Sequence, residues 1–168
     1  MRVAVVFYSF SGNTRRAARI LEKMLTEKGA FIESYELKPV REPSSFAKQC
    51  MQAVMKQTPD LVAFSFAAAS YDALILATPV WAFTVSPAVR TFLKELRVEK
   101  TKAAGFVTYH SGAGVDKALA DLGDLLTRSG ARCMASAKLA GGKTGDEACV
   151  RDALRPLVEA IMEGKKKE

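Results

Sequence analysis

The chain has 168 residues, of which 49% are apolar and 26% are charged, which is the size and balance of one globular domain. We expect this domain to span residues 1–164, followed by a basic tail at 165–168. No apolar run approaches the roughly 18 residues of a membrane span. A strand-like run follows Met1 at once and leaves no room for a signal peptide, so we expect a cytoplasmic protein without a membrane partner.

The formal net charge is +7, and it is scattered along helical segments except in the terminal lysine run at 165–167. No aromatic-plus-basic module accompanies this charge, so we expect no nucleic-acid partner. The three cysteines, Cys50, Cys133 and Cys149, form no Cys-x-x-Cys pair, and His110 is the only histidine. The sequence therefore predicts neither a disulfide framework nor a metal site.

The apolar residues change their period repeatedly between that of a strand and that of a helix. Residues 3–8 are a continuous apolar run, as in a strand buried on both faces. Residues 14–28 place their apolar side chains on one face of a helix. Residues 30–37 alternate weakly and predict a second strand, and a serine cap begins a helix over residues 44–56.

The second half of the chain continues this alternation. Residues 73–78 predict a strand that ends at Pro79, because proline has no amide hydrogen to donate. Pro87 stands in the first turn of a helix that runs to about residue 96. A strand, a helix, a strand and a helix follow, at residues 103–109, 115–128, 131–139 and 146–162. We expect Pro156 to kink the last helix, and the irregular but apolar segment 59–72 to pack against the domain.

Five strands alternating with five helices predict a doubly wound α/β domain, with a parallel sheet covered on both faces. Sheets of this kind bind ligands beyond the carboxyl ends of their strands, near the point where the strand order reverses. The loops after the first, third and fourth strands are therefore the candidate site.

The loop after the first strand is rich in hydroxyl and small side chains: Ser9, Phe10, Ser11, Gly12, Asn13 and Thr14. Hydroxyls can donate hydrogen bonds, glycine lets the backbone approach a ligand, and the amides of the following helix point to the same place. The pattern favours a phosphate cradle that needs no lysine. From these residues alone, a turn that only caps the helix is the alternative.

Gly142, Lys143 and Thr144 look like the end of a nucleotide-binding P-loop. That motif requires a glycine where this chain has Ala137, and it follows the first strand of a sheet rather than the last. We therefore expect a plain loop before the last helix.

Three segments resemble, in order and spacing, the flavin-binding loops of the flavodoxin-like family: residues 5–21, 77–88 and 108–114. The first (VVFYSFSGNTRRAARIL) matches the whole N-terminal signature of that family. The resemblance covers essentially the entire domain. It implies a five-stranded parallel sheet in the order 2-1-3-4-5 and one non-covalently bound FMN. FMN is expected rather than FAD, since no second glycine-rich loop is present for an adenylate half.

The resemblance also implies which residues bind FMN. The phosphate would lie in the first loop, between Ser9 and Thr14. One side and edge of the isoalloxazine would meet Pro79, Val80, Trp81, Ala82 and Phe83. The pyrimidine end would be held, largely by backbone amides, at Tyr109, His110, Ser111, Gly112 and Gly114. Trp81 could instead be a core residue, and His110 could bond the flavin, polarise a substrate or close a strand end.

The family contains small electron carriers and FMN-dependent NAD(P)H oxidoreductases that act on quinones or related acceptors. Carriers commonly have a glycine and then an acidic residue where this chain has Ala82 and Phe83. If a flipped backbone there requires positive φ, a non-glycine residue costs it about 1 kcal/mol. The net charge of +7 would in addition stabilise an anionic reduced flavin.

Both departures favour two-electron, NAD(P)H-dependent reduction of a quinone or similar small acceptor. The alternatives are an electron carrier to a redox partner protein and, less favoured, an interaction domain without FMN. No acid–base catalytic residue can be assigned. The choice between NADH and NADPH stays open, as does the existence of a homo-oligomer.

Overall fold

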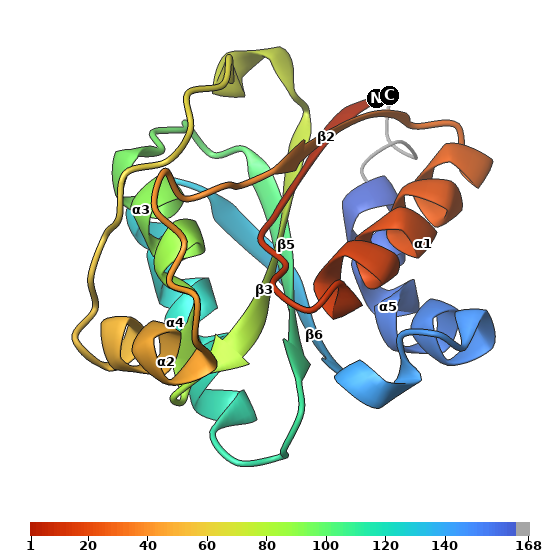
Figure 1. The fold of residues 1–168 in the computed structure, drawn as a ribbon. Helices are drawn as coiled ribbons and strands as arrows, with labels where there is room; N and C mark the ends of the chain where they lie inside the picture. The colour runs from red at the N-terminus through yellow and green to blue at the C-terminus, as the bar shows by residue number, and fades with distance from the viewer. Residues whose placement is uncertain (164–168) are drawn as a thin grey trace.

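Five parallel strands form a sheet in the order β2-β1-β3-β5-β6 in the computed structural model, which describes residues 1–163 (Figure 1). A sixth, short strand pairs antiparallel with the end of β3. In chain order the strands are β1 (Arg2–Phe7), β2 (Phe31–Glu36), β3 (Ala73–Trp81), β4 (Thr84–Val85), β5 (Lys102–Tyr109) and β6 (Arg132–Ala140). Counted over the five long strands, the expected fold and order are confirmed. The expected basic tail at 165–168 lies outside the described residues.

Helices cover both faces of the sheet (Figure 1). On one face lie α1 (Asn13–Glu27) and α5 (Glu147–Met162), and on the other lie α2 (Phe46–Val54), α3 (Pro87–Glu95) and α4 (Val115–Arg128). Two short 3₁₀ turns are η1 (Ala68–Ser70) and η2 (Gly141–Lys143). None of the described helices is long and apolar enough to cross a membrane.

The continuous apolar run of β1 reflects burial on both faces. Val3 and Val5 pack in the core under α1 and α5, whereas Ala4 and Val6 pack in the core on the other face. All four side chains are fully buried. A strand between two helical layers has no polar face, which is why its sequence does not alternate.

Pro79 does not end β3, contrary to the expectation from the sequence. Pro79 pairs with Thr108 of β5, and the strand continues to Trp81. The pairing of β1 with β3 ends near Ala77, whose carbonyl accepts a hydrogen bond from the Tyr8 amide. Residues two apart direct their backbone groups to the same side, so the Pro79 nitrogen faces a side where β1 has already ended. The missing amide hydrogen therefore breaks no ladder bond.

The irregular segment 59–72 packs on the domain, as expected from its apolar content. The Phe66 ring lies 5.2 Å from the Phe92 ring of α3 and 5.5 Å from the Tyr71 ring, measured between centroids. A cavity of about 670 Å³ remains between this segment and α3. This cavity lies away from the three candidate loops and shares no residue with them.

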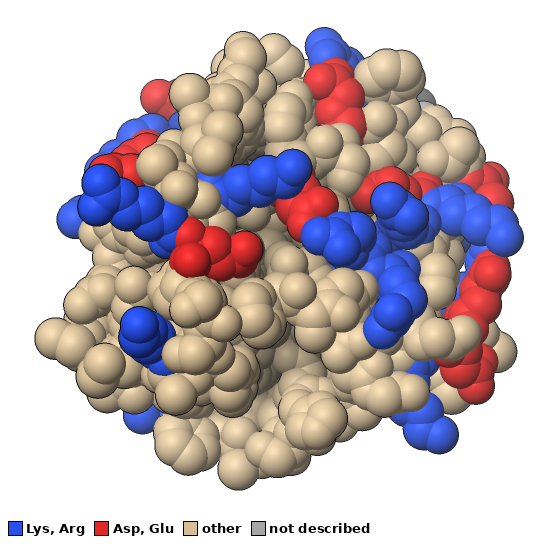
Figure 2. Space-filling model, viewed as in Figure 1, with Lys and Arg blue, Asp and Glu red and all other residues tan. Residues whose placement is uncertain are grey.

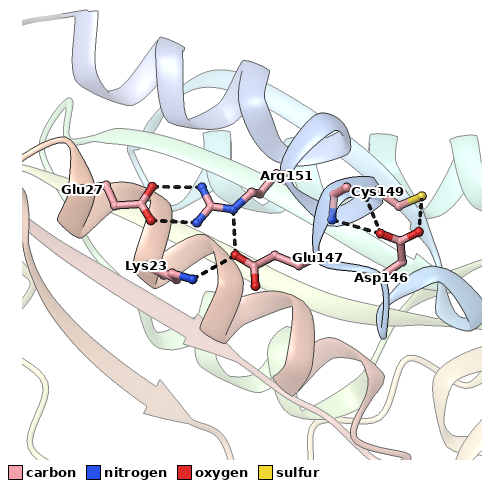
Figure 3. Close-up of polar contacts among 7 residues, drawn as sticks. Lys23, Glu27, Asp146, Glu147, Cys149 and Arg151 are labelled. Atoms are coloured by element: carbon pink, nitrogen blue, oxygen red, sulfur yellow. Dashed lines mark hydrogen bonds and ion pairs between the residues drawn. The ribbon is translucent and has the colours of Figure 1, made fainter.

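α5 begins at a well-formed cap and continues through Pro156. The Asp146 carboxylate accepts hydrogen bonds from the amides of Ala148 (3.0 Å) and Cys149 (3.2 Å), as Figure 3 shows. Such a carboxylate accepts hydrogen bonds from amides that have no partner within the helix. Its negative charge also interacts favourably with the positive end of the helix dipole.

An ion-pair cluster joins α5 to α1 (Figure 3). Arg151 contacts Glu27 (2.7 Å) and Glu147 (2.9 Å), and Lys23 contacts the same Glu147 oxygen (3.0 Å). The hydrogen bond from Arg151 holds the pKa of both carboxyls below the ordinary value of 4.5. Each carboxylate therefore contributes stability above that pH, and the contribution is lost as the pH falls through the lowered pKa values.

We expect Arg151→Gln to lower the melting temperature slightly at pH 7, because exposed ion pairs contribute little. The difference from the wild type should shrink below pH 4.5 and disappear once the pH has fallen through the lowered pKa values, because the carboxylates are then protonated in both proteins. Thermal unfolding across pH measures it. Arg155→Gln is the control, since Arg155 pairs with Asp152 within α5 and, among residues 1–163, forms no ion pair with another helix. An equal deficit at pH 7 and pH 3 would show that Arg151 acts through packing rather than charge.

Candidate functional site

A cavity of about 570 Å³ lies at the carboxyl ends of β1, β3 and β5. Figure 2 shows the surface hollowed in the lower centre, among residues that are mostly neither acidic nor basic, with Lys and Arg side chains to the right. The three loops predicted from the sequence meet there because the carboxyl ends of parallel strands share one edge of the sheet.

Most of the predicted site residues line this cavity: Phe10, Ser11, Asn13, Thr14, Pro79, Val80, Trp81, Ala82, Phe83, Tyr109, His110 and Ser111. The other four lie next to the lining, as members of the same loops: Ser9, Gly12, Gly112 and Gly114. His110 is exposed to solvent at the cavity wall.

The first loop presents donors that have no partner within residues 1–163. The Ser9 hydroxyl is buried, and no described atom hydrogen-bonds it. Gly12 has φ +86° and precedes α1, whose first amides receive no cap from any described side chain. A buried hydroxyl and free helix amides at one place form a site for an anion.

Two arginines of α1 lie close to this loop. A methyl group placed on Gly12 would lie within 4.0 Å of the Nη1 atoms of both Arg15 and Arg16. Arg15 is held by Glu36 of β2, with its Nε 3.0 Å from a carboxylate oxygen. The positive charges of these two arginine side chains favour the binding of an anion in the loop.

Thr14 and Asn13 are partly engaged with other side chains. The Thr14 hydroxyl is fully buried and lies 2.7 Å from the Thr108 hydroxyl of β5. The Asn13 side chain turns toward η2, where its Oδ1 lies 3.3 Å from the Thr144 hydroxyl. Thr144 in turn donates to the Gly141 carbonyl (2.8 Å). The segment that looks like a P-loop therefore supports the first loop through its side chains.

Trp81 is the last residue of β3 rather than a loop residue, and it is only 5% exposed. Its ring meets the rings of Tyr8 (5.3 Å), Phe10 (6.2 Å) and Phe46 (6.3 Å) edge to face. The residue thus belongs to the core and also lines the cavity. The two interpretations drawn from the sequence are not exclusive.

Ala82 and Phe83 form the two-residue turn between β3 and β4, with φ +45° and +67°. Two-residue hairpin turns of type I′ require positive φ at both central positions, and Asn-Gly usually fills them. For alanine and phenylalanine this conformation costs about 1–2 kcal/mol each. From the residue types alone, positive φ is expected to be disfavoured at these two positions. In the structure it is adopted at both positions, because a two-residue hairpin that matches the strand twist demands it.

The third loop closes against this turn. Gly114 has φ +73° and precedes α4, which also has no side-chain cap in the described part of the chain. A Cβ on Gly114 would lie 1.9 Å from Cδ1 of Phe83, so only glycine leaves room for that ring. The aromatic side chain therefore joins the second loop to the third.

Three lining residues lie outside the three predicted loops: Phe46, Cys50 and Gly141. The first two lie on α2, which crosses beside the cavity. Burial raises the pKa of the Cys50 thiol, although a hydrogen bond from the Ala82 backbone opposes this. A methyl group on Gly141 would lie 2.7 Å from the Asn13 amide, so a fourth loop approaches the site closely. No local signal marks these contacts, because they depend on tertiary packing.

The family model for NADPH-dependent FMN reductases matches residues 1–146. The chain belongs to this family. Family membership makes it an FMN-binding redox flavoprotein of the flavodoxin-like fold, as the resemblance of the three loops implies. No curated protein sequence is significantly similar to the chain.

Solved structures share the fold at low sequence identity. A flavoprotein in complex with FMN from Lactobacillus acidophilus is 18% identical, with a TM-score of 0.67 over 88% of this chain and 98% of that one. A Bacteroides uniformis flavoprotein is 16% identical, with a TM-score of 0.71 over 92% and 97%. A flavodoxin from Streptococcus pneumoniae is 15% identical, with a TM-score of 0.64 over 98% and 99%.

The residues present fit FMN. A dianionic phosphate would satisfy the buried Ser9 hydroxyl and the uncapped amides of α1, close to Arg15 and Arg16. The apolar wall formed by Trp81, Phe10 and other aromatic residues suits a flat ring. Polar groups at one end and aromatic groups at the other match the two parts of this cofactor.

Proposed function

We propose that the protein is an FMN-dependent oxidoreductase that carries two electrons from NAD(P)H to a quinone or a similar small acceptor. In the overall reaction NAD(P)H loses a hydride, and the acceptor gains the two electrons of that hydride together with two protons, one of them from solvent. Bound FMN supplies the chemistry, because it can take up a hydride and release electrons. The protein supplies binding, orientation and charge.

The single observation that carries this proposal is the backbone of the Ala82–Phe83 turn. Both residues already occupy the left-handed region, which their side chains disfavour, so contacts with the surrounding structure must hold the turn in this conformation. A turn of this kind offers the same backbone groups to the flavin whatever its oxidation state. Held in one conformation, the turn would offer no rearranged backbone to favour one-electron chemistry, which supports transfer of electrons in pairs.

Charge supports the same conclusion. The net charge is +7, and Arg15 and Arg16 lie beside the proposed phosphate loop. Positive potential stabilises the anionic, fully reduced flavin more than the neutral oxidised form. It also attracts a nucleotide donor that carries several negative charges.

Each loop has a separate task in this proposal. Residues between Ser9 and Thr14 hold the phosphate, and the second loop, from Pro79 to Phe83, lies along the ring. Residues of the third loop, from Tyr109 to Gly114, offer backbone amides to the pyrimidine end. Phe10 and Phe46 keep water away from the ring, since they stand at the aromatic wall beside Trp81.

Stepwise anaerobic reduction of the FMN-loaded protein with NADH or NADPH tests the proposal. We expect the flavin absorbance to bleach directly, without a long-wavelength band from one-electron-reduced flavin. Turnover with a quinone should follow when the reduced protein meets it. Stable accumulation of the long-wavelength band would instead support an electron carrier to a protein partner, and failure of both nucleotides to reduce the flavin would contradict the NAD(P)H reaction.

A further inference from the structure

The turn between β3 and β4 is held from behind by one carboxylate. Asp121, on α4, accepts hydrogen bonds from the Thr84 hydroxyl and from the Val85 amide, the latter at 3.4 Å. These two residues make up the whole of β4, the strand that follows the turn. The position of the Asp121 carboxylate therefore decides where the second half of the hairpin lies.

Arg90, on α3, fixes that carboxylate in turn. Its Nη2 lies 2.6 Å from Asp121 Oδ2 and 2.6 Å from the Thr84 hydroxyl, and the residue is 8% exposed. Arg90 is buried and Asp121 is partly buried, so separating the partners would leave the Arg90 charge uncompensated away from water, and the pair resists rearrangement. Burial raises the pKa of Asp121, but the hydrogen bond from Thr84 and the charge of Arg90 outweigh it and keep the pKa below its ordinary value.

The network joins three elements directly behind the cavity wall. α3 provides Arg90, α4 provides Asp121, and β4 provides Thr84. On the cavity side, the Phe83 ring is packed against Gly114 without room for another methyl group. The turn is thus restrained from both sides, although its two residues are of types that seldom adopt this backbone.

We propose that Asp121 and Arg90 are positioning residues, which hold the Ala82–Phe83 turn in one conformation and thereby keep the bound flavin in two-electron chemistry. The inference rests on the proposed function and says what maintains it. A ligand state can shift a protein only toward a second conformation that binds it better, so a turn held in one conformation cannot rearrange in favour of the one-electron state.

The first test needs no cofactor. In Asp121→Asn, we expect amide hydrogen exchange at Thr84 and Val85 to become about tenfold faster, because local opening of the hairpin becomes easier. Asp124→Asn is the matched control, since it makes the same change at an exposed position of the same helix. Its exchange rates at the hairpin should equal those of the wild type.

A milder pair of variants covers the case in which Asp121→Asn does not fold. Thr84→Val removes only the hydroxyl between the two charged groups and keeps the branched shape. Thr84→Ser restores the hydroxyl. We expect faster hairpin exchange in the valine variant and rescue in the serine variant, a pattern that loss of packing alone would not produce.

The second test uses the FMN-loaded proteins and stepwise anaerobic reduction by dithionite. We expect the yield of one-electron-reduced flavin, read from its long-wavelength band, to rise about fivefold in Asp121→Asn and Thr84→Val. A fivefold change corresponds to about 1 kcal/mol in an equilibrium. In Asp124→Asn the yield should stay at the wild-type level. Unchanged exchange in the first two variants would overturn the proposal, and so would faster exchange without a change in yield. If the wild type itself accumulates the one-electron form, the proposed function fails. If the flavin yield and the hairpin exchange rates of Asp121→Asn still change together in that case, Asp121 remains the residue that positions the turn.

Discussion

Replacing Ser9 by alanine is expected to stabilise the FMN-free protein and to weaken FMN binding. The Ser9 hydroxyl is buried and has no hydrogen-bond partner among the residues that the structure describes. Such a group destabilises a fold by about 1–3 kcal/mol, so its removal should raise the free energy of unfolding by a value toward the lower end of that range. The same removal takes one donor from a charged phosphate, which should weaken FMN binding about tenfold to a hundredfold.

Chemical denaturation without FMN and titration with FMN measure the two effects separately. Ser129→Ala is the matched control, because Ser129 is equally buried but donates to the Leu126 carbonyl at 2.7 Å. That variant should lose stability and keep its affinity for FMN. If Ser9→Ala instead lost stability and bound FMN normally, the phosphate would have to lie elsewhere.

Replacing Thr14 by valine is expected to lower the affinity for FMN about tenfold to a hundredfold, because a charged phosphate loses one hydroxyl donor. The side chain keeps its shape, and the helix keeps its other amides. The FMN-free protein should lose about 1–3 kcal/mol of stability, since the buried Thr108 hydroxyl is left without its partner.

Thr108→Val separates the two roles of the Thr14 hydroxyl. It removes the same hydrogen bond from the other side and leaves the Thr14 hydroxyl in place. Both variants should therefore lose similar stability, whereas FMN affinity should fall much further in Thr14→Val. Equal losses of affinity would mean that the pair shapes the loop and that neither hydroxyl contacts the phosphate.

The strands and helices could be predicted because their signals are local. A strand such as β1, buried between two helical layers, reads as an unbroken apolar run, and α1 shows its buried face at Ala18, Leu21 and Leu25. The end of β3 could not be predicted in this way. Proline is tolerated at position 79 only because β1 ends before it, and nothing in the sequence around Pro79 records where its neighbour ends.

The candidate site divides in the same way. The three loops after the strands could be located, since the carboxyl ends of parallel strands must meet. Cys50 and Gly141 could not be placed beside them, because α2 and the loop after β6 reach the cavity through packing. The conformation of Ala82 and Phe83 could not be predicted either. It depends on the carboxylate of Asp121, which lies 39 residues after position 82 in the chain.

Three phenylalanines stand around the cavity with much of their surface in water: Phe10 is 43%, Phe46 57% and Phe83 50% exposed. A flat ligand that enters the cavity covers part of this apolar surface. Removal of apolar surface from water has a calorimetric signature, a decrease in heat capacity. The enthalpy of FMN binding should therefore become steadily more favourable as the temperature rises, and the protein without its ligand is the form most exposed to self-association through this aromatic rim.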